Sequence, residues 1–402
     1  MLNGILSNYT TGITEITIPQ IIMIGLGLFF AYLSIVKKYE PLLLLPLAFG
    51  IILANIPGAN LSAYDTFNSG VDPETMEPIK RLGLMNFLYS GIMNVIYPPL
   101  IFLCIGAMTD FGPLIANPRT AFIGLGGQLG IFVAFAGAFF LLGEGTWLAS
   151  VIPGFDGFSL GQAASIGIIG SSDGPTSIFA ASRMAPEILS TVAIAAFSYM
   201  ALVPFIQPPI MRALTNAKER VVIMPAARNV SQRKKIIFPI AVTIVTLLLV
   251  PAAGALIGML MLGNLIKESG VTGRYIETLH NSLLNILTLL VALSIGASAR
   301  ADYFLTPQTL IVVFLGLIAF GFGTIGGVLI AKLLYKITGG KINPLIGNSG
   351  VSAMPMAARI SQKMGQQYNP QNYLLMHAMG PIVSSTIASA IVAGIFIAFL
   401  GG

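Results

Sequence analysis

Residues 167–182 read GIIGSSDGPTSIFAAS. They form the centre of an apolar stretch, residues 157–182, in which Gly, Ser and Pro are too frequent for an unbroken helix. The stretch also contains one carboxylate, that of Asp173, among apolar neighbours. We therefore expect a broken or re-entrant segment, with its interruption close to Asp173.

The composition of the chain indicates a membrane protein. Of the 402 residues, 55% are hydrophobic and only 9% are charged, and the mean hydropathy is +0.86. A water-soluble domain carries about a quarter of its residues as Asp, Glu, Lys or Arg, so this chain cannot cover its surface in water. With two His and the single Cys104, the sequence also lacks the ligands for a multi-ligand zinc or iron–sulfur site.

The net charge of +6 does not indicate a nucleic-acid partner. Seven of the 21 basic residues lie in one loop, residues 212–235, and the chain has no domain-sized polar face. Basic clusters of this kind flank membrane spans on the cytoplasmic side. We expect this loop to be cytoplasmic, and its second possible role is to help dock a partner.

Charge-free runs long enough to cross a bilayer, about 20 residues, follow one another along the chain. Nine runs qualify: residues 18–36, 41–64, 82–109, 120–143, 188–211, 236–266, 278–299, 303–331 and 364–402. Residues 342–358 form a further apolar stretch that NSGVSAMP interrupts. Together with residues 157–182, these runs predict an all-α polytopic membrane protein of about 11 hydrophobic segments.

The two interrupted stretches resemble each other. With a shift of 177 residues, Gly170 aligns with Gly347 and Ser172 with Ser349, and the register continues into the next helix. Two copies of five spans face opposite ways in the membrane, because an odd number of crossings separates equivalent helices. The pattern therefore predicts two inverted repeats, as in secondary transporters.

This interpretation divides the chain into four segments: a first span in residues 1–40, a first repeat in residues 41–211, the basic loop 212–235 and a second repeat in residues 236–402. The first apolar run follows no signal-peptide pattern, so we expect it to be retained. With the loop in the cytoplasm, 11 crossings place the N-terminus inside and the C-terminus outside.

Asp173 is the one acidic residue that we expect to lie inside the membrane, since the other fourteen lie in loops or near the ends of the apolar runs. An ionised carboxylate at the centre of a membrane helix costs at least about 2.5–3.5 kcal/mol on insertion scales. Free N–H groups of a half-helix, the hydroxyls of Ser171, Ser172 and Thr176, or a bound cation would offset that cost. Oxygen ligands suit a hard cation such as Na⁺. The alternative is a carboxylate that only caps a half-helix.

Further polar residues lie in or beside the apolar runs, and each has a structural alternative. They are Tyr199, Asn343, Ser349, Ser352 and Arg359. An interhelical hydrogen bond explains the tyrosine, close helix packing explains Ser352, and a snorkelling side chain explains the arginine. Asp110 follows an apolar run, and we expect it to cap a turn.

Four motifs resemble a known family. They are GIIGSSDGPTSIFAASRMAPEIL from residue 167, SYMALVPFIQPPIM from residue 198, INPLIGNSGVSAMPMAARISQKMG from residue 342 and NYLLMHAMGP from residue 372. From about residue 18 to the end, the chain resembles the β subunit of the biotin-dependent sodium-pumping decarboxylases. The resemblance implies a membrane subunit that releases CO2 from carboxybiotin while exporting Na⁺, with uptake of a proton.

The resemblance also implies roles for individual residues. The family's central aspartate falls on Asp173, which is taken to bind Na⁺, and the family's tyrosine and serine of the second ion site and proton delivery fall on Tyr199 and Ser352. We accordingly expect the catalytic residues to be Tyr199, Ser352 and Arg359, and the Na⁺ site or path to comprise Asp173, Ser172, Thr176, Asn343, Gly347 and Ser349. The family usually has Gly-Ala or Gly-Gly where this chain has Ser171 and Ser172, so two extra hydroxyls are present.

Partner chains are part of this expectation. No Met-Lys-Met biotinylation string occurs, so carboxybiotin must arrive on another chain. The resemblance implies a biotin-carrying α subunit, or a carboxyltransferase with a separate biotin carrier, a small membrane γ or δ subunit, an oligomer of the membrane subunit, and a bacterial cytoplasmic (inner) membrane. The alternative is a Na⁺- or H⁺-coupled secondary carrier of a small anion, which needs no biotin partner.

Overall fold

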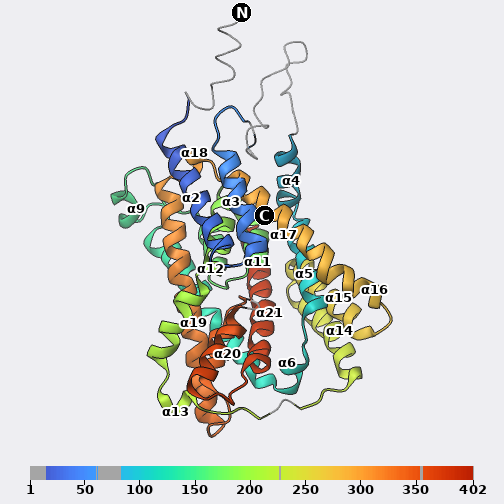
Figure 1. The fold of residues 1–402 in the computed structure, drawn as a ribbon. Helices are drawn as coiled ribbons and strands as arrows, with labels where there is room; N and C mark the ends of the chain where they lie inside the picture. Colours follow the sequence, from blue (N-terminus) through green and yellow to red (C-terminus); the bar gives the residue numbers. More distant parts are fainter. Residues whose placement is uncertain (1–14, 60, 62–82, 226–227, 354–355, 402) are drawn as a thin grey trace, which may run out of the picture. The chain divides into compact units, whose positions relative to one another are not determined.

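The computed structural model describes residues 15–59, 61, 83–225, 228–353 and 356–401 (Figure 1). Residues 1–14 of the expected first segment, parts of the 41–64 run and of the basic loop, and residues 354–355 of the second interrupted stretch lie outside this description. The described chain is helical, and its one extended contact is an isolated bridge between Gly143 and Phe158. The expected all-α architecture is confirmed.

Five helices of the described chain are long and apolar enough to cross a membrane. They are α2 (Ile18–Ile35), the continuous helical stretches Pro118–Leu141 and Gly273–Ser298, α19 (Pro307–Ile337) and α21 (Leu375–Leu400). Two bent pairs, Leu84–Met93 with Tyr97–Met108 and Pro186–Tyr199 with Leu202–Leu214, raise the number to seven when each pair counts as one span. The chain is thus a multi-pass membrane protein, while the expected number of 11 segments is not confirmed.

Residues 1–97 and 285–310 form a first compact unit. Its helices are α2, α3 (Pro41–Ala54), α4 (Leu84–Met93), most of α17 (Leu284–Ser298) and α18 (Ala301–Phe304). Asn55, at the end of α3, donates from Nδ2 to the carbonyl oxygen of Ala299 at 2.8 Å and accepts at Oδ1 from the N–H of Ala301 at 2.9 Å. One buried amide therefore joins the end of α3 to the turn between α17 and α18.

Residues 98–284 and 311–402 form the second unit, which contains both interrupted stretches. Besides most of α19 and all of α21, its elements are α5 (Tyr97–Met108), α6 (Gly112–Ala116), η1 (Pro118–Thr120), α7 (Ala121–Gly127), α8 (Leu129–Ala136), η2 (Gly137–Leu141), α9 (Trp147–Val151), α10 (Leu160–Ile169), α11 (Gly174–Met184), η3 (Pro186–Ile188), α12 (Leu189–Leu214), α13 (Ala217–Arg220), α14 (Gln232–Leu249), η4 (Pro251–Ala253), α15 (Gly254–Ser269), α16 (Gly273–Glu277), η5 (Thr278–Leu283), η6 (Pro344–Gly350) and α20 (Met356–Tyr368).

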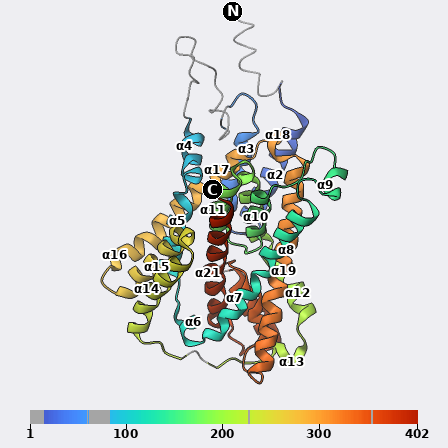
Figure 2. The same cartoon turned by 180° about the vertical axis from the view of Figure 1, so that it is seen from behind.

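Both interrupted stretches are broken where Gly, Ser and Pro are concentrated. In the first, α10 ends at Ile169 and α11 begins at Gly174, with Pro175 in its first turn. In the second, the short 3₁₀ segment η6 ends at Gly350 and α20 begins at Met356. Proline suits the first turn of a helix because the N–H that it lacks has no partner there. Helix α21 packs against α10, α11, η6 and α20, so one helix touches both breaks (Figure 2).

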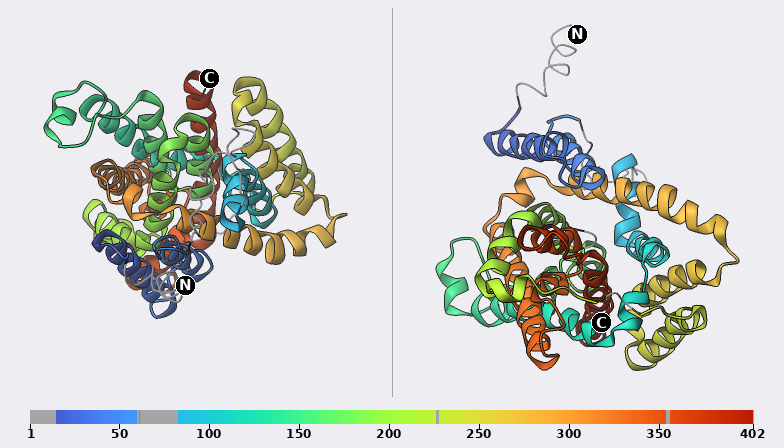
Figure 3. Two further views of the ribbon diagram at one scale, coloured as in Figure 1. Left: turned by 90° about the horizontal axis from the view of Figure 1, so that it is seen from above. Right: turned by 60° about the horizontal axis from the view of Figure 1, so that its bottom comes forward.

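The charge-free run 236–266, which we counted as one span, is two helices. Helix α14 ends at Leu249 and α15 begins at Gly254, with Pro251 opening the short 3₁₀ turn between them. The residue before that proline, Val250, has a non-helical backbone (φ −137°, ψ 79°), as the steric demand of the proline ring requires. The two helices lie side by side as a hairpin (Figure 3).

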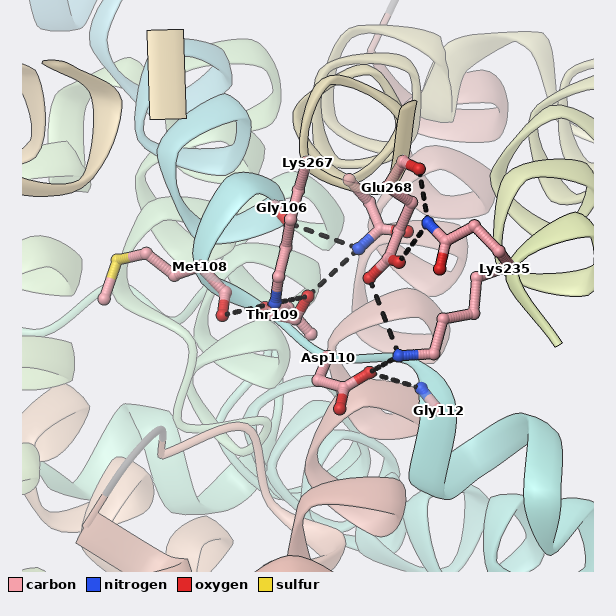
Figure 4. Close-up of polar contacts among 10 residues, drawn as sticks. Gly106, Met108, Thr109, Asp110, Gly112, Lys235, Lys267 and Glu268 are labelled. Carbon is pink, nitrogen blue, oxygen red and sulfur yellow. Dashed lines mark hydrogen bonds and ion pairs between the residues drawn. The ribbon is translucent and has the colours of Figure 1, made fainter. Parts of the chain in front are cut away.

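A cluster of charged and amide side chains joins this hairpin to α5 and α6 (Figure 4). The ammonium of Lys235 lies 3.1 Å from Asp110 Oδ1 and 4.0 Å from Glu268 Oε1. Asp110 also accepts from the N–H of Gly112 at 2.8 Å, which confirms the expectation that it caps a turn. Lys267 donates to the carbonyl oxygen of Thr109 at 3.0 Å. The cluster thus satisfies the carbonyl end of α5, where a helix dipole favours positive charge.

Candidate functional site

The carboxylate of Asp173 lies at the start of α11 and is buried, with 4% of the residue exposed. Its Oδ1 accepts from the N–H of Thr176 at 3.4 Å, so the side chain caps the half-helix. Its Oδ2 accepts from the hydroxyl of Ser389, on α21, at 3.3 Å. Both hydrogen bonds are long, and they leave the carboxylate with acceptor capacity to spare.

No positive side chain of the described chain compensates this charge. Asp110, Glu219, Glu268 and Asp302 are among the acidic residues of the described chain that form ion pairs, whereas Asp173 forms none. A buried charge without a partner is costly. The site therefore favours a bound cation or a proton on the carboxylate.

Two hydroxyls beside Asp173 have no hydrogen-bond partner of ordinary geometry. They are Ser172 Oγ and Thr176 Oγ1, both buried, and the second lies close to the carboxylate. Ser172 also has a left-handed backbone with φ +57°, a conformation that residues other than Gly, Asn and Asp seldom adopt. Unpartnered oxygens around an uncompensated carboxylate are the donor set that a hard monovalent cation needs.

The two breaks touch each other through their backbones. The N–H of Ser352, in the second break, donates to the carbonyl oxygen of Ser171, in the first, at 2.9 Å. The hydroxyl of Ser352 donates to Ser385 Oγ on α21 at 3.1 Å. The structure thus brings Asp173, Ser172, Thr176 and Ser352 of the expected site residues together.

Glycine backbones allow this close arrangement. A Cβ on Gly170 would lie 2.4 Å from the carbonyl carbon of Gly130 on α8, and a Cβ on Gly347 would lie 2.4 Å from Cα of Val328 on α19. No side chain fits at either position without a shift of backbone. Gly347 therefore allows the second broken segment to pack directly against the backbone of α19. Its contribution is this close backbone contact, because glycine has no side chain.

Ser349 belongs to a separate buried network in the second broken segment. Its hydroxyl donates to Asn348 Oδ1 at 3.4 Å, and Ser361 of α20 donates to the same oxygen at 2.5 Å. Asn348 Nδ2 in turn donates to Gln207 Oε1 of α12 at 2.8 Å, and Gln207 Nε2 donates back to the Asn348 carbonyl oxygen at 3.0 Å. These bonds hold η6 to α12 and α20.

Asn343 lies at the beginning of η6 and not beside Asp173. Its Oδ1 accepts from the N–H of Leu345 at 2.9 Å, and its Nδ2 donates to the carbonyl oxygens of Arg220 and Val222 at 3.1 and 2.8 Å. The side chain therefore joins the second broken segment to the last residue of α13 and to the chain that follows it.

Tyr199 and Arg359 point elsewhere. The hydroxyl of Tyr199, on α12, donates to the carbonyl oxygen of Val313 on α19. Arg359 is exposed on α20 and lines an open cavity of about 470 Å³ together with Gln362, Lys363, Gln366, Gln367 and Leu375. Neither side chain forms a hydrogen bond with the residues around Asp173.

Three residues of the site were not predicted from the sequence. Ser385 and Ser389, four residues apart on α21, reach the second and the first break respectively. Gln128, between α7 and α8, donates from Nε2 to Ser385 Oγ at 3.1 Å. Two features of the sequence could have indicated them. Gln128 is the one amide side chain in the apolar run 120–143, and Ser385 and Ser389 are spaced four residues apart in the run 364–402, as on one face of a helix.

The sequence is similar to one well-defined group of proteins. Residues 19–400 match the family described as Na⁺-transporting oxaloacetate decarboxylase beta subunit. The methylmalonyl-CoA decarboxylase subunit beta of Propionigenium modestum is 49% identical, and the match covers 100% of both sequences. The glutaconyl-CoA decarboxylase subunit beta of Acidaminococcus fermentans is 48% identical over 98% of this chain and 96% of the relative. The oxaloacetate decarboxylase beta chain 2 of Salmonella typhi is 45% identical over 99% of each. These similarities favour the decarboxylase interpretation over a secondary carrier.

Proposed function

We propose that this chain, which belongs to the family of Na⁺-transporting oxaloacetate decarboxylase beta subunits, decarboxylates carboxybiotin held by a partner chain and uses that reaction to export Na⁺. The observation that carries the proposal is the uncompensated Asp173 carboxylate, which lies beside unpartnered hydroxyls where two broken helices meet. The enzyme activity resides in the complex, and this chain is its membrane subunit.

Na⁺ binds, in this proposal, to Asp173 with the hydroxyl oxygens of Ser172 and Thr176. The carboxylate supplies the charge, and the two hydroxyls supply ligands that no hydrogen bond occupies. Ser389 turns its hydrogen away from Asp173 Oδ2 when the ion enters and offers its lone pairs instead. Because these ligands come from α11, the preceding turn and α21, a relative movement of these elements opens or closes the site.

Decarboxylation of carboxybiotin needs a positive group for the carboxylate and a proton for the biotin that is released. Arg359, beside Lys363 in the open cavity on α20, suits the first task because both side chains are cationic and the cavity is accessible. Ser352 and Tyr199 are our candidates for the second task. Asn343, Gly347 and Ser349 then shape the ion path by holding η6 between α12, α19 and α20.

A coupled reaction is needed on energetic grounds. Moving two Na⁺ outward across about 150 mV costs on the order of 7 kcal/mol before any concentration difference, and an incoming proton returns about half of that. A passive pore does not provide this free energy, so CO2 release must depend on ion movement. We propose alternating access, in which the two inverted repeats let both broken segments move together against the remaining helices.

The proposal includes an assembly. Carboxybiotin arrives on a biotin-carrying α subunit, or on a separate biotin carrier served by a carboxyltransferase. A small membrane γ or δ subunit and further copies of this chain complete the complex in a bacterial cytoplasmic membrane. The basic loop 212–235 faces the cytoplasm, where such a carrier is available.

The substitution Asp173→Asn tests the function. In the assembled complex reconstituted into vesicles, we expect it to abolish Na⁺ uptake and the Na⁺ dependence of CO2 release, because the neutral amide keeps the shape but removes the charge. Asp302→Asn is the matched control, since Asp302 lies in an exposed ion pair with Arg300 at 2.8 Å. Retention of Na⁺-dependent CO2 release by the Asp173→Asn complex contradicts the proposal.

A further inference from the structure

The hairpin of α14 and α15 (Figure 3) has a groove between its two helices. The volume of the groove is about 230 Å³, and its lining is apolar except for Thr243. The Thr243 hydroxyl donates to the carbonyl oxygen of Pro239 at 2.8 Å, so its hydrogen is already used. The buried Met261 and the exposed Ile240 and Leu262 all line the groove, which therefore reaches from the interior of the hairpin to the surrounding lipid.

Gly258, on α15, keeps the groove open. A Cβ at this position would have no atom of another helix within 4 Å. By contrast, a Cβ on Gly263 would lie 2.0 Å from the carbonyl oxygen of Leu103, because α15 packs directly on α5 there. One glycine of α15 thus serves close helix packing, whereas Gly258 borders space that no helix of the described chain fills.

The size of the groove favours an acyl chain over a protein helix as its occupant. A helix is about 10–12 Å wide with its side chains, so a volume of 230 Å³ accommodates less than about one helical turn. An acyl chain is only about 4 Å across, the ordinary separation of carbon atoms in contact, and can lie along the groove. The bilayer around a multi-pass membrane protein supplies such chains.

A cation lies at the end of the hairpin where α14 begins. Arg233 is exposed, and its side chain forms no ion pair or hydrogen bond with the described residues. With Ile240 and Ile244 it has the spacing i, i+7 and i+11, which places all three on one face of α14. Lys235 lies about 200° around the helix from Arg233 and pairs with Asp110 on the protein side (Figure 4). Arg233 therefore lies on the face of α14 that carries the groove and not on the face of the ion cluster.

We infer that this groove is a binding site for an anionic phospholipid, with one acyl chain between α14 and α15 and the phosphate at the guanidinium of Arg233. Arginine presents a planar set of N–H donors that matches phosphate oxygens. Basic residues at the cytoplasmic ends of spans attract the anionic lipids of that leaflet, and the loop 212–235, which we place in the cytoplasm, ends here. The inference goes beyond the proposed function, since it holds whether or not Asp173 binds Na⁺.

The test labels the assembled complex with photoreactive lipids. The complex is reconstituted into phosphatidylcholine vesicles that contain a trace of photoreactive phosphatidylglycerol or, separately, of photoreactive phosphatidylcholine with the same acyl chains. Mass spectrometry then measures the label on residues 236–266. We expect about fivefold more label from the phosphatidylglycerol probe, the preference that one basic residue provides at a membrane surface.

Two variants test the two parts of the site. Arg233→Gln should lower labelling by phosphatidylglycerol to the level of phosphatidylcholine, whereas Lys218→Gln, which removes an exposed cation from the other end of the same loop, should keep the difference. Gly258→Leu should lower the label from both probes, because the new side chain fills the groove. Gly25→Leu is its matched control, since a Cβ on Gly25 of α2 also has no atom of another helix within 4 Å.

Several results would overturn the inference. Equal labelling of the unmodified complex by the two probes refutes a site for an anionic headgroup, as does a preference that survives Arg233→Gln or one that Lys218→Gln abolishes. Absence of label from residues 236–266 with both probes shows that a partner subunit or a second copy of this chain covers the groove, which also refutes it. Should Gly258→Leu not assemble, Gly258→Ala replaces it, and unchanged labelling of that variant refutes the place given to the acyl chain.

Discussion

At the residue scale, Ser172 combines an unfavourable backbone conformation with a hydroxyl that is available as an ion ligand. A left-handed φ of +57° costs a serine about 1–2 kcal/mol, yet its hydroxyl is unpartnered and buried beside Asp173. Glycine would adopt the same backbone without strain. A serine at this position is therefore useful for its hydroxyl and not for its conformation.

The variants Ser172→Gly and Ser172→Ala divide these two contributions. Both remove the hydroxyl, so we expect both to raise the half-saturating Na⁺ concentration of CO2 release several-fold. Only the glycine variant removes the strain of the left-handed backbone, so its folded state should be more stable than that of the alanine variant by about 1 kcal/mol. This difference should appear as a higher midpoint of thermal unfolding in detergent for the glycine variant. Equal Na⁺ affinity in all three proteins would remove Ser172 from the ion site.

At the element scale, the position of the α14–α15 hairpin depends on the ionised form of Asp110. Burial alone raises the pKa of Asp110, but the N–H of Gly112 and the ammonium groups of Lys235 and Lys267 outweigh burial and lower it below its ordinary value. A carboxyl group whose pKa is lower in the folded state stabilises that state above the unfolded pKa, about 3.9. This stabilisation is lost as the pH falls through the lower, folded pKa.

Acidification should therefore loosen the hairpin before it affects the rest of the second unit. We expect amide hydrogen exchange in α14 and α15, compared with an Asp110→Asn variant at each pH, to differ at neutral pH and to converge below about pH 4. Asp302→Asn serves as the control, since its ion pair with Arg300 lies in the other unit. A difference that persists at low pH would show that the Asp110 charge does not hold the hairpin.

At the scale of the whole molecule, the sequence was informative about where helices break and less so about which helices meet. The Gly, Ser and Pro content around Asp173 predicts the first break because these residues act locally on the backbone. Ser385, Ser389 and Gln128 enter the site through contacts between segments distant in sequence, which a periodic pattern does not reveal. Pro251 was a local signal as well, but a charge-free run of 31 residues concealed the hairpin.

The relatives also indicate that this chain does not select the acid that the complex decarboxylates. Relatives named for methylmalonyl-CoA, glutaconyl-CoA and oxaloacetate decarboxylases are 49%, 48% and 45% identical to it. Such similar membrane subunits under three different substrate names agree with a division of labour in which another chain selects the acid. The site around Asp173 then needs to handle only steps common to all three complexes, which are CO2 release and ion movement.

The membrane topology provides the last prediction, because it depends on the parity of the crossings. If the α14–α15 hairpin, the second broken segment and the remaining helices together make an odd number of crossings after the 212–235 loop, the C-terminus lies outside, as expected from the repeats. Single cysteines at Lys218 in the loop and at Gly401 test this, labelled with a membrane-impermeant maleimide in vesicles of either orientation. Cys104 is buried and should stay unlabelled, so it provides the background. We expect Lys218→Cys to react only in inside-out vesicles and Gly401→Cys only in right-side-out vesicles. Labelling of both from the same side would refute the inverted repeats, since two copies of opposite orientation require the loop and the C-terminus to lie on opposite faces.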